Sequence, residues 1–224
     1  MRIGILGGTG PAGSALGSRL ASVGYDVVIG SRSAERAAAV CSELVARYPE
    51  IVTRLSGGDN AAAAEGDVVV VATPWDSAAT TVRENSEALQ GKVLVSMANA
   101  LVRVTGEFQP LLPPRGSVAA HIQAAAPRSR VVAALHHLPA KELGHLGAPI
   151  DSDVLICSDD RESVRIVSEI VERIPGCRPL DAGQLSNATA IEAFTAVLLQ
   201  LNVRYKTRVA LKLSGFHSPR THAE

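Results

Sequence analysis

Short runs of valine, isoleucine and leucine alternate along the chain with longer, alanine-rich stretches. The apolar runs are RIGILGG, DVVIGSR, DVVVVATP, KVLVSMAN, RVVAALHHL, DVLICSD and CRPLDAG. Several runs are continuously apolar, without alternating polar residues, which is typical of strands buried on both faces. The pattern therefore predicts a mostly parallel sheet with helices on both sides.

The stretches between these runs have helical patterns. Helices are expected over residues 11–23, 34–48, 77–89 and 161–174, with Ser33 and Asp160 as N-caps. A proline-rich loop, QPLLPPRGS, leads into a short predicted helix over 118–126. The chain is expected to be α/β: a Rossmann-like, doubly wound domain over 1–183, followed by a small helical C-terminal segment over 184–224.

A long helix is predicted over residues 188–213. Its apolar residues recur at i+3 and i+4 spacing and form a stripe. The stripe could pack on its own domain or against a second copy of the chain. The residues are Ile191, Phe194, Leu198, Leu201 and Tyr205. Residues 216–224 are expected to be a frayed tail.

Composition excludes several classes of function. The chain has 224 residues, 22 basic and 22 acidic, so its charge favours neither nucleic acid nor an anionic membrane as partner. No apolar run is long enough to span a bilayer, and the N-terminus lacks the long apolar segment of a signal peptide. Cys41, Cys157 and Cys177 show no C-x-x-C spacing, which favours free thiols in the cytoplasm and no zinc site.

A glycine-rich turn, GGTGPAG, follows the first predicted strand and opens a helix. Gly8, Gly10 and Gly13 form G-x-G-x-x-G, which allows a tight turn and a close approach of backbone to a pyrophosphate. The helix N-terminus then directs free N–H groups at the anion. The strand–turn–helix context predicts dinucleotide binding. The residues expected to line the phosphates are Thr9, Gly10, Pro11 and Ala12.

The end of the second strand lacks the carboxylate that holds the ribose 2′-hydroxyl of NAD. The positions read Gly30, Ser31, Arg32, and Arg36 follows one helical turn later. A guanidinium matches a phosphate with paired donors, and Ser31 adds a hydroxyl. The sequence therefore predicts that NADP is preferred over NAD.

Ligands of open α/β sheets bind outside the carboxyl ends of the strands. Three such ends carry candidates. These are Thr73, Trp75 and Ala78 after one strand, Ala98 and Asn99 after the next, and His136 to Ala140 after a third. Trp75 borders the nicotinamide half or caps the sheet edge, and both interpretations stay open.

Two neighbouring histidines lie in the third of these segments. Adjacent residues of a strand point to opposite faces, so His136 and His137 should not chelate one metal. His136 is either functional or a satisfied structural histidine. Ser186 and Asn187 open the long helix, where they either cap it or receive a second ligand.

General acids are scarce. The sequence has no Y-x-x-x-K motif, and Lys92 and Lys141 are the only lysines before the C-terminal helix. The sequence therefore offers few residues that could serve as the strong proton donor that some hydride transfers need.

Four segments together resemble the NADPH:coenzyme F420 oxidoreductases over nearly the whole chain. They are GGTGPAGSALGSRLASVGYDVVIGSR, ATPWD, AALHHLPA and RPLDAGQLSN. The resemblance implies hydride transfer between NADP(H) and the deazaflavin F420, a co-substrate stacked on the nicotinamide, in a homodimer. Catalysis then rests on positioning the two rings, without a catalytic side chain.

The resemblance also implies the site residues. Thr9, Gly10, Pro11, Ala12, Ser31, Arg32 and Arg36 would bind NADP, and Thr73, Trp75, Ala78, Ala98 and Ala140 would surround its nicotinamide end. His136, Leu138, Pro139, Ser186 and Asn187 would border the deazaflavin. Two alternatives remain: an NADPH-dependent reductase of a flavin, metal chelate, carbonyl or imine, and an NADP-binding redox sensor.

Overall fold

A single eight-stranded sheet forms the centre of the molecule. The computed structural model describes residues 1–215, so the expected frayed tail lies outside the described residues. The strand order is β10 (Cys177–Asp181), β9 (Ser152–Ser158), β8 (Arg130–Ala133), β5 (Val93–Ser96), β4 (Val68–Val71), β1 (Arg2–Leu6), β2 (Asp26–Ser31) and β3 (Leu55–Asp59). The part from β3 to β8 is parallel and has the strand order of a Rossmann fold, so the predicted fold class is confirmed.

The last two strands run the other way. β9 pairs with β8 in antiparallel fashion, and β10 is parallel to β9. The carboxyl ends of β9 and β10 therefore lie at the edge of the sheet opposite to those of the other six strands. The sequence pattern does not specify this reversal.

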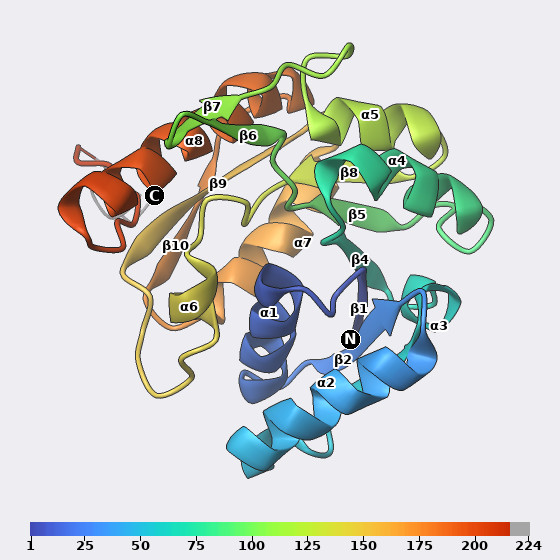
Figure 1. Cartoon of the computed structure of the whole chain (residues 1–224). Helices are drawn as coiled ribbons and strands as arrows, with labels where there is room; N and C mark the ends of the chain where they lie inside the picture. The colour runs from blue at the N-terminus through green and yellow to red at the C-terminus, as the bar shows by residue number, and fades with distance from the viewer. Residues whose placement is uncertain (216–224) are drawn as a thin grey trace, which may run out of the picture.

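Helices cover both faces of the sheet (Figure 1). One core contains side chains of α1 (Pro11–Ser22), α2 (Ala34–Arg47) and α7 (Arg161–Glu172). The core on the other face contains side chains of α3 (Asn60–Ala64), α4 (Trp75–Glu84), α5 (Val118–Ala125) and α8 (Ala188–Tyr205). The described chain also has a short helix, α6 (Ala140–Leu143), two 3₁₀ turns (Pro49–Ile51 and Leu185–Asn187) and a hairpin of β6 (Leu101–Val104) and β7 (Glu107–Pro110).

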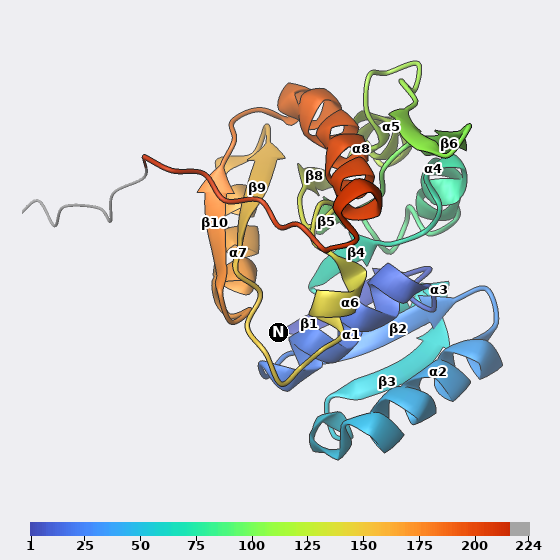
Figure 2. The ribbon, with the colours of Figure 1, turned by 60° about the vertical axis from the view of Figure 1, so that its left-hand side comes forward.

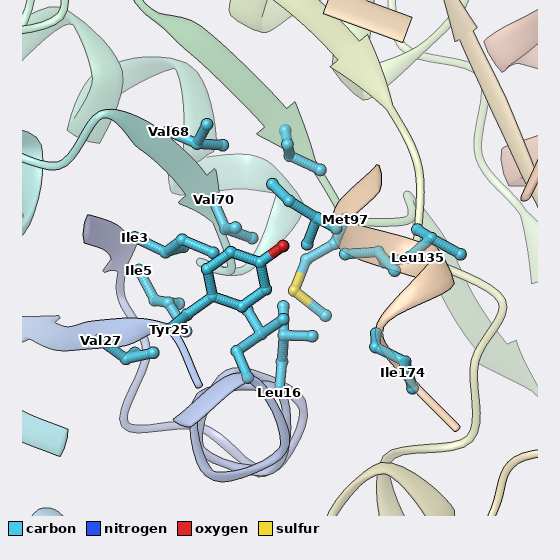
Figure 3. Packing of buried hydrophobic residues seen from close by; sticks show 14 of the residues in the cluster. Ile3, Ile5, Leu16, Tyr25, Val27, Val68, Val70, Met97, Leu135 and Ile174 are labelled. Atoms are coloured by element: carbon cyan, nitrogen blue, oxygen red, sulfur yellow. The ribbon is translucent and has the colours of Figure 1, made fainter. Parts of the chain in front are cut away.

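The continuously apolar strands are buried on both faces, as the pattern predicts. In β4, Val68 and Val70 join the first core, whereas Val69 and Val71 join the second. Figure 3 shows the first core from close by, with Tyr25 packed between Leu16 of α1 and the sheet residues Ile3 and Val70. Each fully buried valine contributes about 1.5–3 kcal/mol relative to an exposed one.

Most predicted helices are present, with corrected ends. Ser33 and Asp160 cap α2 and α7 by accepting hydrogen bonds from the N–H groups of Arg36 and Ser163. The helix predicted over 77–89 is α4, which begins earlier and ends at Glu84. The helix predicted to reach residue 213 ends at Tyr205, because Lys206 takes a left-handed conformation with φ 51°.

The segments that the sequence pattern missed are short. β3 contains two glycines, α3 and α6 are single turns of helix, and β7 takes up part of the predicted proline-rich loop. None has enough apolar residues to set a period, so neighbouring elements determine their structure.

Candidate functional site

An open cleft of about 750 Å³ lies where the strand order reverses direction, at the carboxyl ends of β1, β2, β4 and β5. This is the ligand-binding edge of an open α/β sheet. Segments far apart in sequence line the cleft: the glycine turn after β1, the start of α2, one side of α4, and the residues after β5. Of the predicted site residues, it contains Thr9, Gly10, Pro11, Ala12, Ser31, Arg32, Arg36, Thr73, Trp75 and Ala98.

The glycine turn has the geometry of a phosphate cradle. The left-handed conformation falls on Gly7, with φ 65°, and not on Gly8, where the sequence places the tight turn. A Cβ at Gly7 would lie 2.4 Å from Cγ2 of Thr73, so a side chain there is excluded. A Cβ at Gly10 would meet no atom within 4 Å, which leaves open space above the start of α1. The N-terminus of α1 faces this space with its unpaired N–H groups.

One end of the cleft is basic. Arg32 and Arg36 are exposed, Ser31 is buried at the end of β2, and all three line the cleft. Within residues 1–215, neither guanidinium forms an ion pair with a carboxylate. The nearby Glu35 accepts a hydrogen bond from Ser33 (2.7 Å), which is the main cause of the lowered pKa of this carboxyl group. The arrangement offers two free guanidinium groups and a hydroxyl to a phosphate.

The other end of the cleft is apolar, with two buried polar atoms. Trp75, Met97 and Ala98 supply the apolar wall. Two cleft-lining residues have a side-chain oxygen buried without a hydrogen-bond partner in the described structure, Oγ1 of Thr73 and Oδ1 of Asn99. Because buried polar atoms are nearly always hydrogen-bonded in proteins, these unpaired atoms indicate that a ligand binds here.

The orientation of the Asn99 amide is set by its neighbour. Its Nδ2 donates to the carbonyl oxygen of His136 (2.8 Å), so Oδ1 is the atom left over. Asn99 lines the cleft, and its free atom is an acceptor. It can therefore accept a hydrogen bond from a ring N–H or a carboxamide at this end of the cleft.

The two histidines are not on a strand, contrary to the expected alternation. β8 ends at Ala133, and Leu135 turns the chain with a left-handed φ of 67°. The rings therefore lie near each other, edge to face, with centroids 5.3 Å apart. Nε2 of His137 is 2.9 Å from the carbonyl oxygen of Asp153, whereas both ring nitrogens of His136 are without a partner in the described structure.

Burial determines the protonation of His136. It is 6 % exposed, and burial, reinforced by the neighbouring His137, lowers the pKa of His136 to about 3. Burial also lowers the pKa of His137. His136 is consequently neutral at physiological pH and cannot serve as a cationic acid. His136 is not among the residues that line the cleft, and its contact with Asn99 is through its backbone carbonyl, which accepts from Nδ2 of Asn99.

Several predicted residues lie outside the cleft. Ala78 is fully buried in the core under α4, and Leu138 is buried in the other core. Pro139 precedes α6, and Ala140 lines a separate groove beside α1.

Ser186 and Asn187 are also elsewhere. They follow the reversed strand β10, and the hydroxyl of Ser158, at the end of β9, donates to the carbonyl of Val131 near the start of β8 (2.6 Å). Their segment is therefore at the edge opposite the cleft. Asn187 does not cap α8 either, since its side chain donates to the carbonyl of Ala182 (2.6 Å). Ser186 and Asn187 are therefore not among the residues of the cleft.

Other cleft residues were not predicted as part of the site. Asn60 accepts from the N–H of Gly7 (3.0 Å) and so holds the glycine turn. Thr80, Thr81 and Glu84 line the cleft from α4. The polar i, i+3 and i+4 spacing of the α4 residues was a usable signal, whereas Asn60 depends on the short strand β3 that the pattern missed.

No cluster of three or more His, Cys, Asp or Glu side chains that could hold a metal occurs within the described part of the chain. Across residues 1–215, no helix is both long and apolar enough to cross a membrane.

Comparisons with known proteins agree with this geometry. A family model described as "NADP oxidoreductase coenzyme F420-dependent" matches residues 2–100. The F420-dependent NADP reductase of Methanocaldococcus jannaschii is 37% identical over 213 residues, covering 93% of this chain and 95% of that protein. The enzyme of the same name from Methanothermobacter marburgensis is 34% identical over 224 residues, covering 94% and 96%.

A solved structure shares the fold. It is a candidate F420-dependent NADP reductase from Arthrobacter sp. FB24, with a TM-score of 0.78 and 24% sequence identity. The match covers 94% of this chain and 99% of that one.

Proposed function

The chain belongs to the family of coenzyme F420-dependent NADP oxidoreductases, and from this premise we propose that it transfers a hydride between NADP(H) and the deazaflavin coenzyme F420. The observation that carries the proposal is the cleft at the switch point, basic at one end and apolar with unpaired polar atoms at the other. The basic end suits the 2′-phosphate of NADP, and the apolar end suits the nicotinamide and the ring that stacks on it.

The described residues fit NADP. Thr9, Gly10, Pro11 and Ala12 surround the open space at the start of α1, where a pyrophosphate would meet backbone N–H groups. At the end of β2, Ser31, Arg32 and Arg36 would hold the 2′-phosphate, because the strand ends in a hydroxyl and a guanidinium in place of the carboxylate that binds a 2′-hydroxyl.

The apolar end would hold the nicotinamide. Thr73, Trp75 and Ala98 form its walls, and the unpaired Oδ1 of Asn99 would orient the nicotinamide by accepting a hydrogen bond from its carboxamide N–H. The backbone carbonyl of His136 holds Asn99 by accepting a hydrogen bond from its Nδ2. When bound, the nicotinamide and the deazaflavin supply the two carbons between which the hydride moves.

The protein's part in such a reaction is positioning. The ionisable groups among the described residues lining the cleft are Arg32, Arg36 and Glu84, and the two arginines belong to the 2′-phosphate end. Glu84 is the one acid among these lining residues, and a transfer between two stacked rings does not need an acid. Holding reactive atoms about 3–3.5 Å apart can supply much of the rate enhancement.

We further propose a cytoplasmic homodimer. The three cysteines, Cys41, Cys157 and Cys177, are free, which suits a reducing compartment. On α8, Phe194, Val197 and Tyr205 are 40%, 49% and 68% exposed and lie at helical spacing. An exposed apolar helix face of this kind favours burial against a second copy.

The function is tested by mixing purified protein with NADPH and oxidised F420 and following the loss of the deazaflavin's visible absorbance, with NADH as the control. Rapid bleaching with NADPH and slow bleaching with NADH is the expected result. Tight NADPH binding without bleaching would overturn the assignment of the acceptor and leave the NADP site in place.

A further inference from the structure

A second cavity lies beside the cleft and plays no part in the function described so far. This basic groove, of about 430 Å³, runs between α1, the end of α2, α6 and Arg208. Figure 2 shows α6 against α1, with the chain that follows α8 passing over it toward β9 and β10. The groove shares Pro11 with the cleft, so the two cavities meet at the start of α1.

The groove has an excess of positive charge. Arg47, Lys141 and Arg208 line it, and Glu142 is the one carboxylate among its described lining residues. Glu142 is already paired with Arg208, at 2.9 Å. Within residues 1–215, Arg47 and Lys141 have no carboxylate partner. Two cations are thus available to an anion in the groove, and His145 lies beside them.

The walls are held in place before any ligand arrives. Arg19, only 1% exposed, donates to five backbone carbonyls between Glu142 and Ala148. The hydroxyl of Tyr48 donates to the carbonyl of Gly144 (2.8 Å), and the guanidinium of Arg47 lies over the Tyr48 ring, 5.3 Å from its centroid. The wall and the Arg47 guanidinium are therefore ordered in advance, which lowers the loss of freedom on binding.

The position of the groove suggests what it binds. α6 begins four residues after His136, so a ligand whose ring lies near Asn99 and His136 can extend a side chain along α6. The 2′-phosphate of NADP has its own candidate site on the other side of the glycine turn, at Ser31 and Arg32. The anion in the groove therefore belongs to a second molecule.

We propose that the basic groove binds the anionic side chain of the deazaflavin substrate. This inference rests on the proposed function. Coenzyme F420 carries a phosphate and glutamate carboxylates on a flexible chain attached to its ring, which is the chemistry that Arg47 and Lys141 attract. The groove then contributes to the affinity for the acceptor and not to the hydride step.

The test compares F420 with a truncated deazaflavin that ends at the ribityl hydroxyl and lacks phosphate and carboxylates. The double variant Arg47→Gln/Lys141→Gln should raise KM for F420 about tenfold, since each exposed ion pair contributes modestly. It should leave kcat, KM for NADPH and KM for the truncated acceptor unchanged. The matched control, Arg128→Gln/Arg161→Gln, removes two exposed arginines at the opposite edge of the sheet and should change none of these constants.

The wild-type protein gives an independent arm if the double variant does not fold. Raising the ionic strength from 0.05 to 0.5 M should raise KM for F420 more than KM for the truncated acceptor, because salt screens the groove. Equal effects on both acceptors would overturn the proposal. A second result would also overturn it: inorganic pyrophosphate inhibits the wild type but not the double variant, and the double variant has an unchanged KM for F420. The groove would then bind a free anion and not the substrate's side chain. Failure of the wild type to reduce either acceptor would instead overturn the proposed function.

Discussion

At the scale of single residues, we propose that Arg32 selects NADP over NAD. Arg32→Ala removes one charge-assisted partner of the 2′-phosphate, which should raise the dissociation constant for NADPH about 10–100-fold. The constant for NADH should change less than threefold, because NADH has no group there. Fluorescence titration with both nucleotides measures this, with Arg161→Ala as the control. Equal losses for NADPH and NADH would contradict the role of Arg32.

Asn99 allows a second residue-scale prediction. Its Oδ1 is buried without a described partner, so Asn99→Leu should remove one hydrogen bond to a bound ring. A lost buried hydrogen bond of about 1–3 kcal/mol corresponds to a decrease in kcat/KM of about 5–150-fold. Steady-state kinetics with NADPH and F420 measures this effect.

The matched control is Asn187→Leu. Asn187 also donates to a backbone carbonyl, but at the opposite edge of the sheet, so its loss should cost stability and no activity. A kinetic loss in the Asn187 variant without one in the Asn99 variant would return the second-ligand site to the start of α8.

At the scale of elements, Glu192 joins α8 to α5. Its carboxylate accepts from the N–H groups of Val118 (2.8 Å) and Ala119 (3.1 Å), the first residues of α5. Glu192 is 4% exposed, and burial raises its pKa from 4.5 to about 7. Between these pH values the folded protein holds a proton that the unfolded chain has lost. This contribution to stability is complete below pH 4.5 and is lost as pH rises through 7.

The prediction is a pH-dependent difference between the wild type and Glu192→Gln. Glutamine keeps a carbonyl acceptor but does not titrate. The free energy of unfolding of the wild type, relative to that of the variant, should fall by about 2–3 kcal/mol from pH 4.5 to pH 8. Denaturant titrations at each pH measure it. A rise instead would mean that the two N–H groups of α5 favour the carboxylate more than burial disfavours it.

Elements also show what the sequence could and could not predict. The strands of the Rossmann core and helices α1, α2 and α7 follow from their period and caps, because each has enough apolar residues to define a face. The cradle residues after β1 and β2 could be located for the same reason. The direction of β9 and β10 has no such signal, because the apolar pattern of a strand is the same whether it pairs in parallel or antiparallel fashion. That reversal moves Ser186 and Asn187 from the expected edge to the opposite one.

The prediction that His136 and His137 alternate on a strand was wrong for a related reason. RVVAALHHL is apolar throughout, so it reads as one strand, but the left-handed turn at Leu135 ends the alternation. Leucine rarely adopts this conformation, and such positions often occur at functional sites. The expected boundary between residues 183 and 184 stays a prediction.

At the scale of the whole molecule, the predicted stripe on α8 divides into two parts. Ile191 and Leu198 are buried at 8% and 6%, whereas Phe194 and Tyr205 are exposed with Val197 on the outer face. Part of the stripe therefore packs on its own domain, and part of it is exposed, where we propose that a second copy binds. Burying an exposed apolar face against a second copy is favourable by about 25 cal/mol per Å² before the costs of association.

The prediction is that Phe194→Asp/Val197→Asp produces a monomer. Placing carboxylates in an apolar interface leaves buried charges without partners, which costs several kcal/mol and shifts the equilibrium at micromolar concentration. Light scattering after size exclusion measures the mass directly. Val52→Asp is the matched control, because Val52 is 57% exposed on a different surface and its variant should remain a dimer. A monomeric wild type at 50 µM, or an aspartate variant that stays dimeric, would show that this face of α8 is not the interface.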